Sequence, residues 1–137
     1  MGYSGSSYMD VPMNQKIFMA QYECIKKLAE QESCIIVGRC ADYALKDMPG
    51  LVSVFISADM DFKIKRVIEM YGCDEVKAKD IINKTNKKRA SYYNFYSNKK
   101  WADSRSYNLC INSSVVGIES AADLIIQFMN LKLNKKD

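Results

Sequence analysis

Two short apolar runs, separated by only 13 residues, constrain the fold of this chain more than any other feature. The first run is Ser-Cys-Ile-Ile-Val at residues 33–37, and the second covers residues 51–58. Runs of this kind, rich in β-branched residues, are typical of strands covered on both faces. The link from Gly38 to Gly50 is near the minimum length for a right-handed parallel crossover. The chain is therefore predicted to be an α/β protein.

The remaining pattern extends this prediction along the chain. We expect parallel strands at about 34–38, 51–57 and 107–112, flanked by amphipathic helices whose apolar residues recur at helical spacing. Residues 1–13, rich in Gly and Ser and closed by Pro12, are predicted to be a flexible loop, and residues 73–106 a helical, lid-like segment. We predict that residues 1–137 form a single domain.

Composition excludes several classes of protein. The 137 residues are 48% apolar, and their longest apolar stretch is far short of the roughly 18–20 residues that cross a bilayer. The N-terminal sequence lacks the features of a secretory signal, so we expect a cytoplasmic protein. The five cysteines form no C-x-x-C pair, and histidine is absent. We therefore expect no disulfide framework, no metal site and no histidine-based catalysis.

Positive charge is concentrated in one segment. Residues 84–105 contain seven basic residues against the single acid Asp103, a net charge of +6. Because the whole chain carries +4, the remainder carries −2. Such an excess attracts phosphate groups. The segment could be a flap that closes over phosphoryl groups, a surface that binds single-stranded nucleic acid by stacking Tyr92, Tyr93, Tyr96 or Trp101 on bases, or a solvated helix face over packed tyrosines.

Polar residues follow two of the predicted strands, where ligands bind in open α/β sheets. Gly38 would allow a sharp turn, and the guanidinium of Arg39 could bind a phosphate through two parallel hydrogen bonds. Asp42, one helical turn later, could accept hydrogen bonds from a ribose or a base, or it could simply pair with Arg39. Ser113, in Asn112-Ser113-Ser114, could contact a nucleotide, although a turn accounts for these residues equally well.

Taken together, these motifs resemble the cytidylate kinase-like family of P-loop nucleoside monophosphate kinases. The resemblance covers roughly residues 12–130. It rests on a helix that contains Lys65-Arg66-Val67 and on four further stretches: Ser-Cys-Ile-Ile-Val-Gly-Arg-Cys-Ala-Asp-Tyr, Val-Ser-Val-Phe-Ile, Asn-Lys-Thr-Asn-Lys-Lys-Arg-Ala-Ser-Tyr-Tyr-Asn-Phe-Tyr and Leu-Cys-Ile-Asn-Ser-Ser. It implies a three-layer P-loop NTPase fold with a basic helical lid. It also implies transfer of the γ-phosphoryl group of ATP, with Mg²⁺, to CMP or a related nucleoside monophosphate.

The resemblance also implies roles for individual residues. Lys88 and Arg89 would neutralise the phosphoryl group during transfer and are the expected catalytic residues. The expected substrate-binding residues are Gly38, Arg39, Asp42, Lys84, Asn86 and Ser113. Arg39 would hold the monophosphate and Asp42 the nucleoside. Asn86 stands where relatives are expected to carry Asp, so a contact made there by a carboxylate would lose its charge.

One family element is missing from this sequence, which contains no G-x-x-x-x-G-K-[ST]. That loop supplies the backbone nest, the Lys and the Mg²⁺ ligand for ATP. We therefore expect this chain to correspond to the carboxy-terminal part of such a kinase, to bind neither ATP nor Mg²⁺ firmly and to be inactive alone. We also expect it to self-associate through exposed edges. The alternatives are a non-catalytic module for nucleotides or single-stranded nucleic acid, and a structural or partner-binding domain.

Overall fold

The structure is a computed structural model that describes residues 6–135. It forms two compact units, Met1–Leu51 and Val52–Asp137, where the sequence predicted a single domain. Each unit has its own apolar core. No helix of the described chain is long and apolar enough to span a bilayer.

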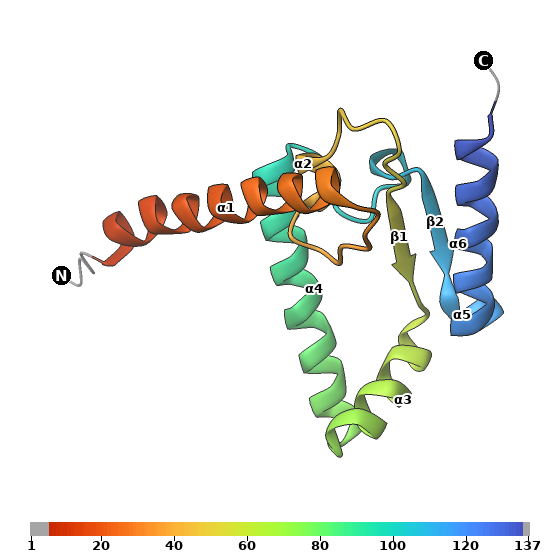
Figure 1. The fold of residues 1–137 in the computed structure, drawn as a ribbon. Helices are drawn as coiled ribbons and strands as arrows, with labels where there is room; N and C mark the ends of the chain where they lie inside the picture. The colour runs from red at the N-terminus through yellow and green to blue at the C-terminus, as the bar shows by residue number, and fades with distance from the viewer. Residues whose placement is uncertain (1–5, 136–137) are drawn as a thin grey trace. The chain divides into compact units, whose positions relative to one another are not determined.

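The first unit contains the long helix α1 (Ser6–Gln31) and the short helix α2 (Ala41–Ala44) (Figure 1). The loop predicted for residues 1–13 is wrong from residue 6 onward, and residues 1–5 lie outside the described chain. Helix α1 runs through Pro12, although proline lacks the N–H that would bond to the carbonyl of residue 8. The core of this unit consists of Ile25, Ala41, Ala44 and Leu45.

The strand predicted at 34–38 is wrong, because residues 33–37 have no regular secondary structure and no strand partner in the described chain. A strand requires a hydrogen-bonded neighbour, whatever its sequence. Ile36 packs against the core of the first unit, whereas Ile35 and Val37 are 95% and 87% exposed. Residues 35–37 therefore alternate between exposed and half-buried side chains, as in a strand, although they belong to no sheet of the described chain.

The second unit holds a two-stranded parallel sheet and most of the helices. Strand β1 (Val54–Ser57) pairs with strand β2 (Leu109–Asn112), so that Val54 lies opposite Leu109 and Ser57 opposite Asn112. These are shorter versions of the strands predicted at 51–57 and 107–112, and their parallel pairing is confirmed. The chain is thus mixed α/β and mostly helical, and the three-layer P-loop arrangement stays a prediction.

Helices α3 (Met60–Tyr71) and α4 (Glu75–Ser97) follow β1 and diverge from the turn that joins them (Figure 1). Gly72 ends α3 in the left-handed conformation, and the carboxylate of Asp74 accepts a hydrogen bond from the Lys77 N–H at 2.7 Å to begin α4. The two helices share a core of Ile64, Ala78 and Ile82. The helix expected within 73–106 is therefore α4, and its role as a lid stays a prediction.

The chain then passes through the short 3-10 helix η1 (Ser104–Ser106) to β2, α5 (Ser113–Val116) and α6 (Ile118–Leu133). Helix α6 packs beside β2, where Ile111 and Ala121 are buried. The C-terminal ends of β1 and β2 thereby lie side by side at one end of the sheet (Figure 1).

Candidate functional site

The first candidate site is a strained turn in the first unit. Gly38, Arg39 and Cys40 all have left-handed backbone angles, with φ of 73°, 56° and 53°. Glycine adopts this conformation freely, but each L-residue with a side chain pays about 1–2 kcal/mol for it. Backbone hydrogen bonds from Ala41 to Gly38 and from Ala44 to Cys40, both 3.1 Å, hold the turn. Strain retained at two successive residues is typical of functional sites.

The side chains of this turn point in different directions. Arg39 is exposed to solvent, whereas Cys40 is buried and Asp42, in α2, is half-buried. Burial, reinforced by the nearby Asp42 carboxylate, raises the pKa of the Cys40 thiol to about 11. The thiol therefore stays protonated at neutral pH and acts as a packing group, not as a nucleophile. Arg39 is left as the exposed cation of the turn.

The second candidate site is one face of α4. Ile82, Asn86, Arg89 and Tyr93 follow a 4-3-4 spacing, so they lie on a single stripe of the helix. The two ends of the stripe are anchored, since Ile82 packs with Ile64 of α3 and Tyr93 stacks on Tyr107 with ring centroids 5.7 Å apart. Asn86 is half-buried and Arg89 is exposed. This inner face therefore presents an amide and a guanidinium between two packed segments.

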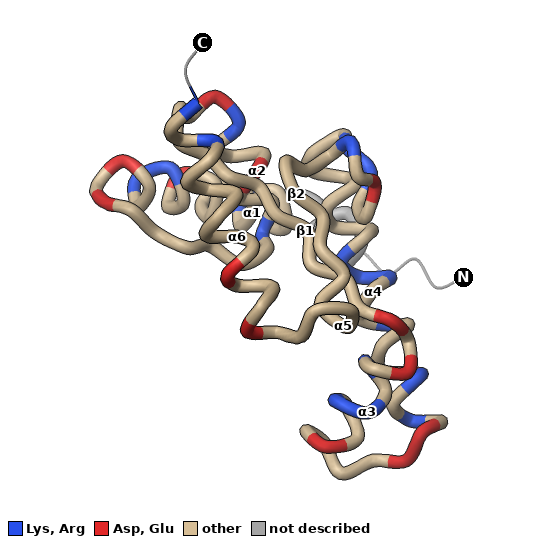
Figure 2. Tube along the Cα trace, turned by 90° about the vertical axis from the view of Figure 1, so that its right-hand side faces the viewer, with Lys and Arg blue, Asp and Glu red and all other residues tan. Residues whose placement is uncertain are grey.

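The other two candidates on α4 lie on a different face. By helical spacing Lys84 and Lys88 are displaced by more than a quarter turn from the inner face, and both are exposed. Lys84 Nζ also forms an ion pair with Asp80 Oδ2 at 3.0 Å. Basic residues recur along α4 (Figure 2), but of the basic residues predicted for the site only Arg89 shares a face with Asn86. Lys88 and Arg89, the predicted catalytic pair, thus lie on different faces of α4.

Ser113 lies at the C-terminal end of the sheet and is buried. Its hydroxyl donates to the Ser57 carbonyl at 2.9 Å and so joins the ends of β1 and β2. Beside it, Asn112 Nδ2 donates to Asp59 Oδ1 at 2.9 Å, and the Asp59 N–H donates to the Ser114 hydroxyl at 3.0 Å. The side-chain bonds from Asn112 and Ser114 lower the pKa of Asp59. In this structure Ser113 is a structural residue, and its contact with a nucleotide stays a prediction.

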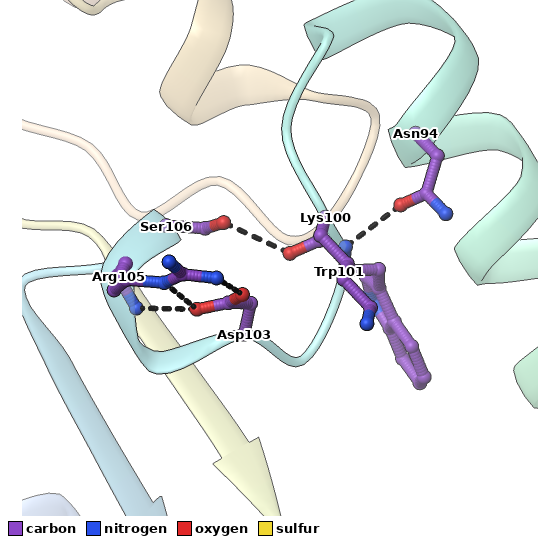
Figure 3. A network of polar contacts seen from close by, with 6 residues as sticks. All are labelled: Asn94, Lys100, Trp101, Asp103, Arg105 and Ser106. Carbon is purple, nitrogen blue, oxygen red and sulfur yellow. Dashed lines mark hydrogen bonds and ion pairs between the residues drawn. The ribbon is translucent and has the colours of Figure 1, made fainter.

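A network that the sequence did not predict fixes the loop after α4 (Figure 3). The Trp101 N–H donates to Asn94 Oδ1 at 2.7 Å, and the Ser106 hydroxyl donates to the Lys100 carbonyl at 2.8 Å. Arg105 binds the Asp103 carboxylate through two side-chain bonds of 3.0 and 2.7 Å and holds the pKa of Asp103 well below its usual range. The only signal in the sequence was a lone acid in a basic segment.

Aromatic packing attaches this loop to the sheet. The Phe55 ring of β1 meets Trp101 edge to face at 5.1 Å and Tyr107 at 5.0 Å. Because Tyr107 also stacks on Tyr93, the cluster connects β1, the loop and the inner face of α4. Trp101 and Tyr93 therefore have packing roles in the second unit.

The two units divide the predicted site residues between them. Gly38, Arg39 and Asp42 belong to the first unit, and Lys84, Asn86, Lys88, Arg89 and Ser113 to the second. The structure brings together the first three in one turn, and Asn86 with Arg89 on one helix face. No three His, Cys, Asp or Glu side chains of the described residues gather as a metal ion would require.

Comparison with known proteins gives a family and a solved structure. The sequence model described as "Cytidylate kinase-like family" matches residues 1–115. A crystal structure of an uncharacterized protein from Eubacterium ventriosum ATCC 27560 is similar, with a TM-score of 0.82 and 44% sequence identity over 85% of this chain. This chain spans 66% of the length of that protein. No curated protein matches the chain.

Proposed function

The chain belongs to the cytidylate kinase-like family, and from this premise we propose that it binds a nucleoside monophosphate, with CMP as the first choice, as the acceptor in phosphoryl transfer. Family membership indicates a nucleotide kinase-like protein. The observation that carries the proposal is the run of left-handed residues at Gly38, Arg39 and Cys40. A turn of this kind projects the Arg39 guanidinium into solvent, where it can bind a phosphate through two parallel hydrogen bonds.

The other residues of the turn would complete the acceptor site. Asp42 lies one helical turn from Arg39 and can accept hydrogen bonds from a ribose hydroxyl or from the amino group of cytosine. Gly38 allows the backbone to reverse without a side chain. Cys40, buried and protonated, holds the turn on the core of the first unit.

The basic residues of α4 would act on the phosphoryl group. Arg89, on the inner face with Asn86, is the residue to which we assign charge neutralisation during transfer. Asn86 would donate or accept a hydrogen bond toward the nucleotide. The family resemblance gives Lys88 the same role as Arg89, and Lys84 and Ser113 roles in substrate binding. Their directions, ion pair and burial make them the weaker candidates.

The donor half of the reaction is not assigned to these residues. The sequence contains no G-x-x-x-x-G-K-[ST], and the described residues include no cluster of metal-ligating side chains. The described residues therefore lack the groups that would hold ATP and Mg²⁺. The proposal concerns recognition of the acceptor nucleotide.

Nucleotide titration tests the proposal. We would measure binding of CMP, AMP and ATP with Mg²⁺ by calorimetry, using the emission of Trp101 as a second signal. CMP should bind saturably and in preference to AMP. Arg39→Ala should weaken CMP binding by about 30-fold, since a hydrogen-bonded charge pair contributes about 2 kcal/mol. The matched control is Lys27→Ala, which removes an exposed cation from α1 of the same unit. Equal losses in the two variants would show only non-specific attraction.

The outer face of α4 supports a second candidate function, binding of single-stranded nucleic acid. Lys84 and Lys88 share this face with Phe95, which is 67% exposed, and Tyr92 adjoins it, with its ring 4.8 Å from that of Tyr96. An exposed aromatic ring beside lysines suits a stacked base and a phosphate backbone. Phe95→Ala should then weaken binding of an oligonucleotide, with a steep salt dependence, and leave CMP binding unchanged.

A further inference from the structure

Helix α6 carries an apolar stripe beside the face that packs on the sheet. Ile118, Ala122, Ile126, Met129 and Leu133 follow a 4-4-3-4 spacing, which places them along one face of the helix. All five are exposed, and the four large side chains are 38–56% exposed. An apolar stripe four turns long is the pattern of a helix that packs on another helix.

This stripe is separate from the face by which α6 packs in its own unit. Ala121 is buried beside β2, and Ile125 and Phe128 are half-buried on the same side. On the other side of the buried face lies Leu131, which is 75% exposed. By helical spacing Leu131 lies nearly opposite the middle of the stripe, so one helix offers both a candidate seam and an apolar position outside it.

Four of the five stripe positions pair with one another when the helix is reversed. In an antiparallel pair with its two-fold axis near Ile126, Ile118 lies opposite Leu133 of the second copy, and Ala122 lies opposite Met129. A small residue thus faces a long one, as close helix packing requires. The two surfaces of such a pair are the same patch, which is the condition for a closed dimer.

The distribution of charge along α6 also favours antiparallel pairing. The first turn of α6 contains Glu119 and its last turn contains Lys132. Asp123 follows Glu119, and Lys135 follows the helix end. Antiparallel pairing brings the acidic beginning of each helix beside the basic end of the other, and it opposes the two helix dipoles. Parallel pairing would bring like charges together. Lys132 Nζ is held near the helix end by a 3.0 Å bond to Asn108 Oδ1.

We propose that two copies of this chain dimerise through antiparallel packing of α6 along the stripe formed by Ile118, Ala122, Ile126, Met129 and Leu133. The partner is therefore a second copy of the chain, and the seam is independent of the nucleotide site proposed above. Because the two-fold axis passes near Ile126, the two copies of this residue lie close together in the dimer.

Sedimentation equilibrium of the full chain over about 1–200 µM tests the proposal, a range set to bracket a micromolar dimer. The wild type should be dimeric at the upper end. Ile126→Glu should weaken dimerisation by at least about 100-fold, since it removes two buried isoleucines and places two carboxylates together. Leu131→Glu makes the same change on the opposite face and should leave the dimer intact. Circular dichroism checks that both variants keep the helical content of the wild type.

Each contrary outcome overturns the proposal. A monomeric wild type would show that the stripe has no affinity for itself. Equal weakening by both variants would show unspecific association of apolar surfaces. The antiparallel direction of the two α6 helices is tested by disulfide formation. The A122C and M129C variants, each with Cys24, Cys34 and Cys110 replaced by serine, are mixed under mild oxidation. Antiparallel packing predicts a disulfide between the two different variants, and disulfides formed only between like variants would refute it.

Discussion

Replacing Arg39 by glycine and by alanine should separate the effect of the strained turn on stability from the role of Arg39 in CMP binding. Both substitutions remove the guanidinium, but only glycine also removes the strain of a left-handed residue with φ of 56°. The two variants should therefore bind CMP equally weakly and yet differ in stability. The glycine variant should be the more stable one.

The magnitude follows from two opposing terms. Left-handed geometry costs an L-residue about 1–2 kcal/mol, and the greater freedom of glycine in the unfolded chain costs about 0.4–1 kcal/mol. The glycine variant should thus exceed the alanine variant by about 1 kcal/mol in free energy of unfolding. In a chain of this size, that difference raises the melting temperature by about 4 °C.

Urea unfolding followed by circular dichroism measures the difference in stability, and calorimetry with CMP measures binding. Lys27→Gly and Lys27→Ala are the matched controls, because residue 27 lies within α1, where glycine should be the less stable choice. If glycine were no more stable than alanine at residue 39, the turn would not be strained. If both variants bound CMP as the wild type does, Arg39 would not hold the phosphate.

Three further predictions concern stability and reactivity. Ile82→Ala should cost about 2–4 kcal/mol in urea unfolding, because Ile82 is buried between α3 and α4, whereas Val76→Ala, at an exposed position of α4, should cost little. The lowered pKa of Asp59 predicts a contribution to stability that is complete above the ordinary Asp pKa of about 4 and is lost as the pH falls toward the lowered value, and Asp59→Asn should flatten this part of the pH profile of unfolding. Cys40, buried and with a pKa of about 11, should react with a thiol reagent at pH 8 far more slowly than the exposed Cys110; comparable rates would show that the turn opens.

Sequence patterns predicted those parts of the fold that depend on local spacing. The strands near 54–57 and 109–112 and the helices after them follow from apolar periodicity and from caps such as Asp74. Pairing is not local, however. Residues 33–37 have the composition of a buried strand but no strand neighbour among residues 6–135, so the same pattern gives a segment in which Ile35 and Val37 are exposed.

The residue types of the candidate site could be predicted from the sequence, but the backbone conformation of its turn and the contacts of its side chains could be predicted less well. The turn at Gly38 and Arg39 was recognisable, but its left-handed backbone could not be inferred for a residue such as Cys40. Helical spacing alone would have separated Arg89 from Lys88, because one lies on the stripe of Ile82 and the other does not. The hydrogen bond of Ser113 to Ser57 joins residues 56 positions apart, and only the fold could show it.

The parallel register of β1 and β2 also limits how the second unit can fold. Val54 pairs with Leu109, so the ladder closes a loop of 55 residues at an entropic cost of about 3.5 kcal/mol if that loop is unstructured. Eight strand residues in two short segments form few interactions to offset this entropic cost. Prior formation of the α3–α4 hairpin, whose contacts are local, shortens the effective loop. We therefore expect the sheet to form late in folding, after the helices on which its assembly depends.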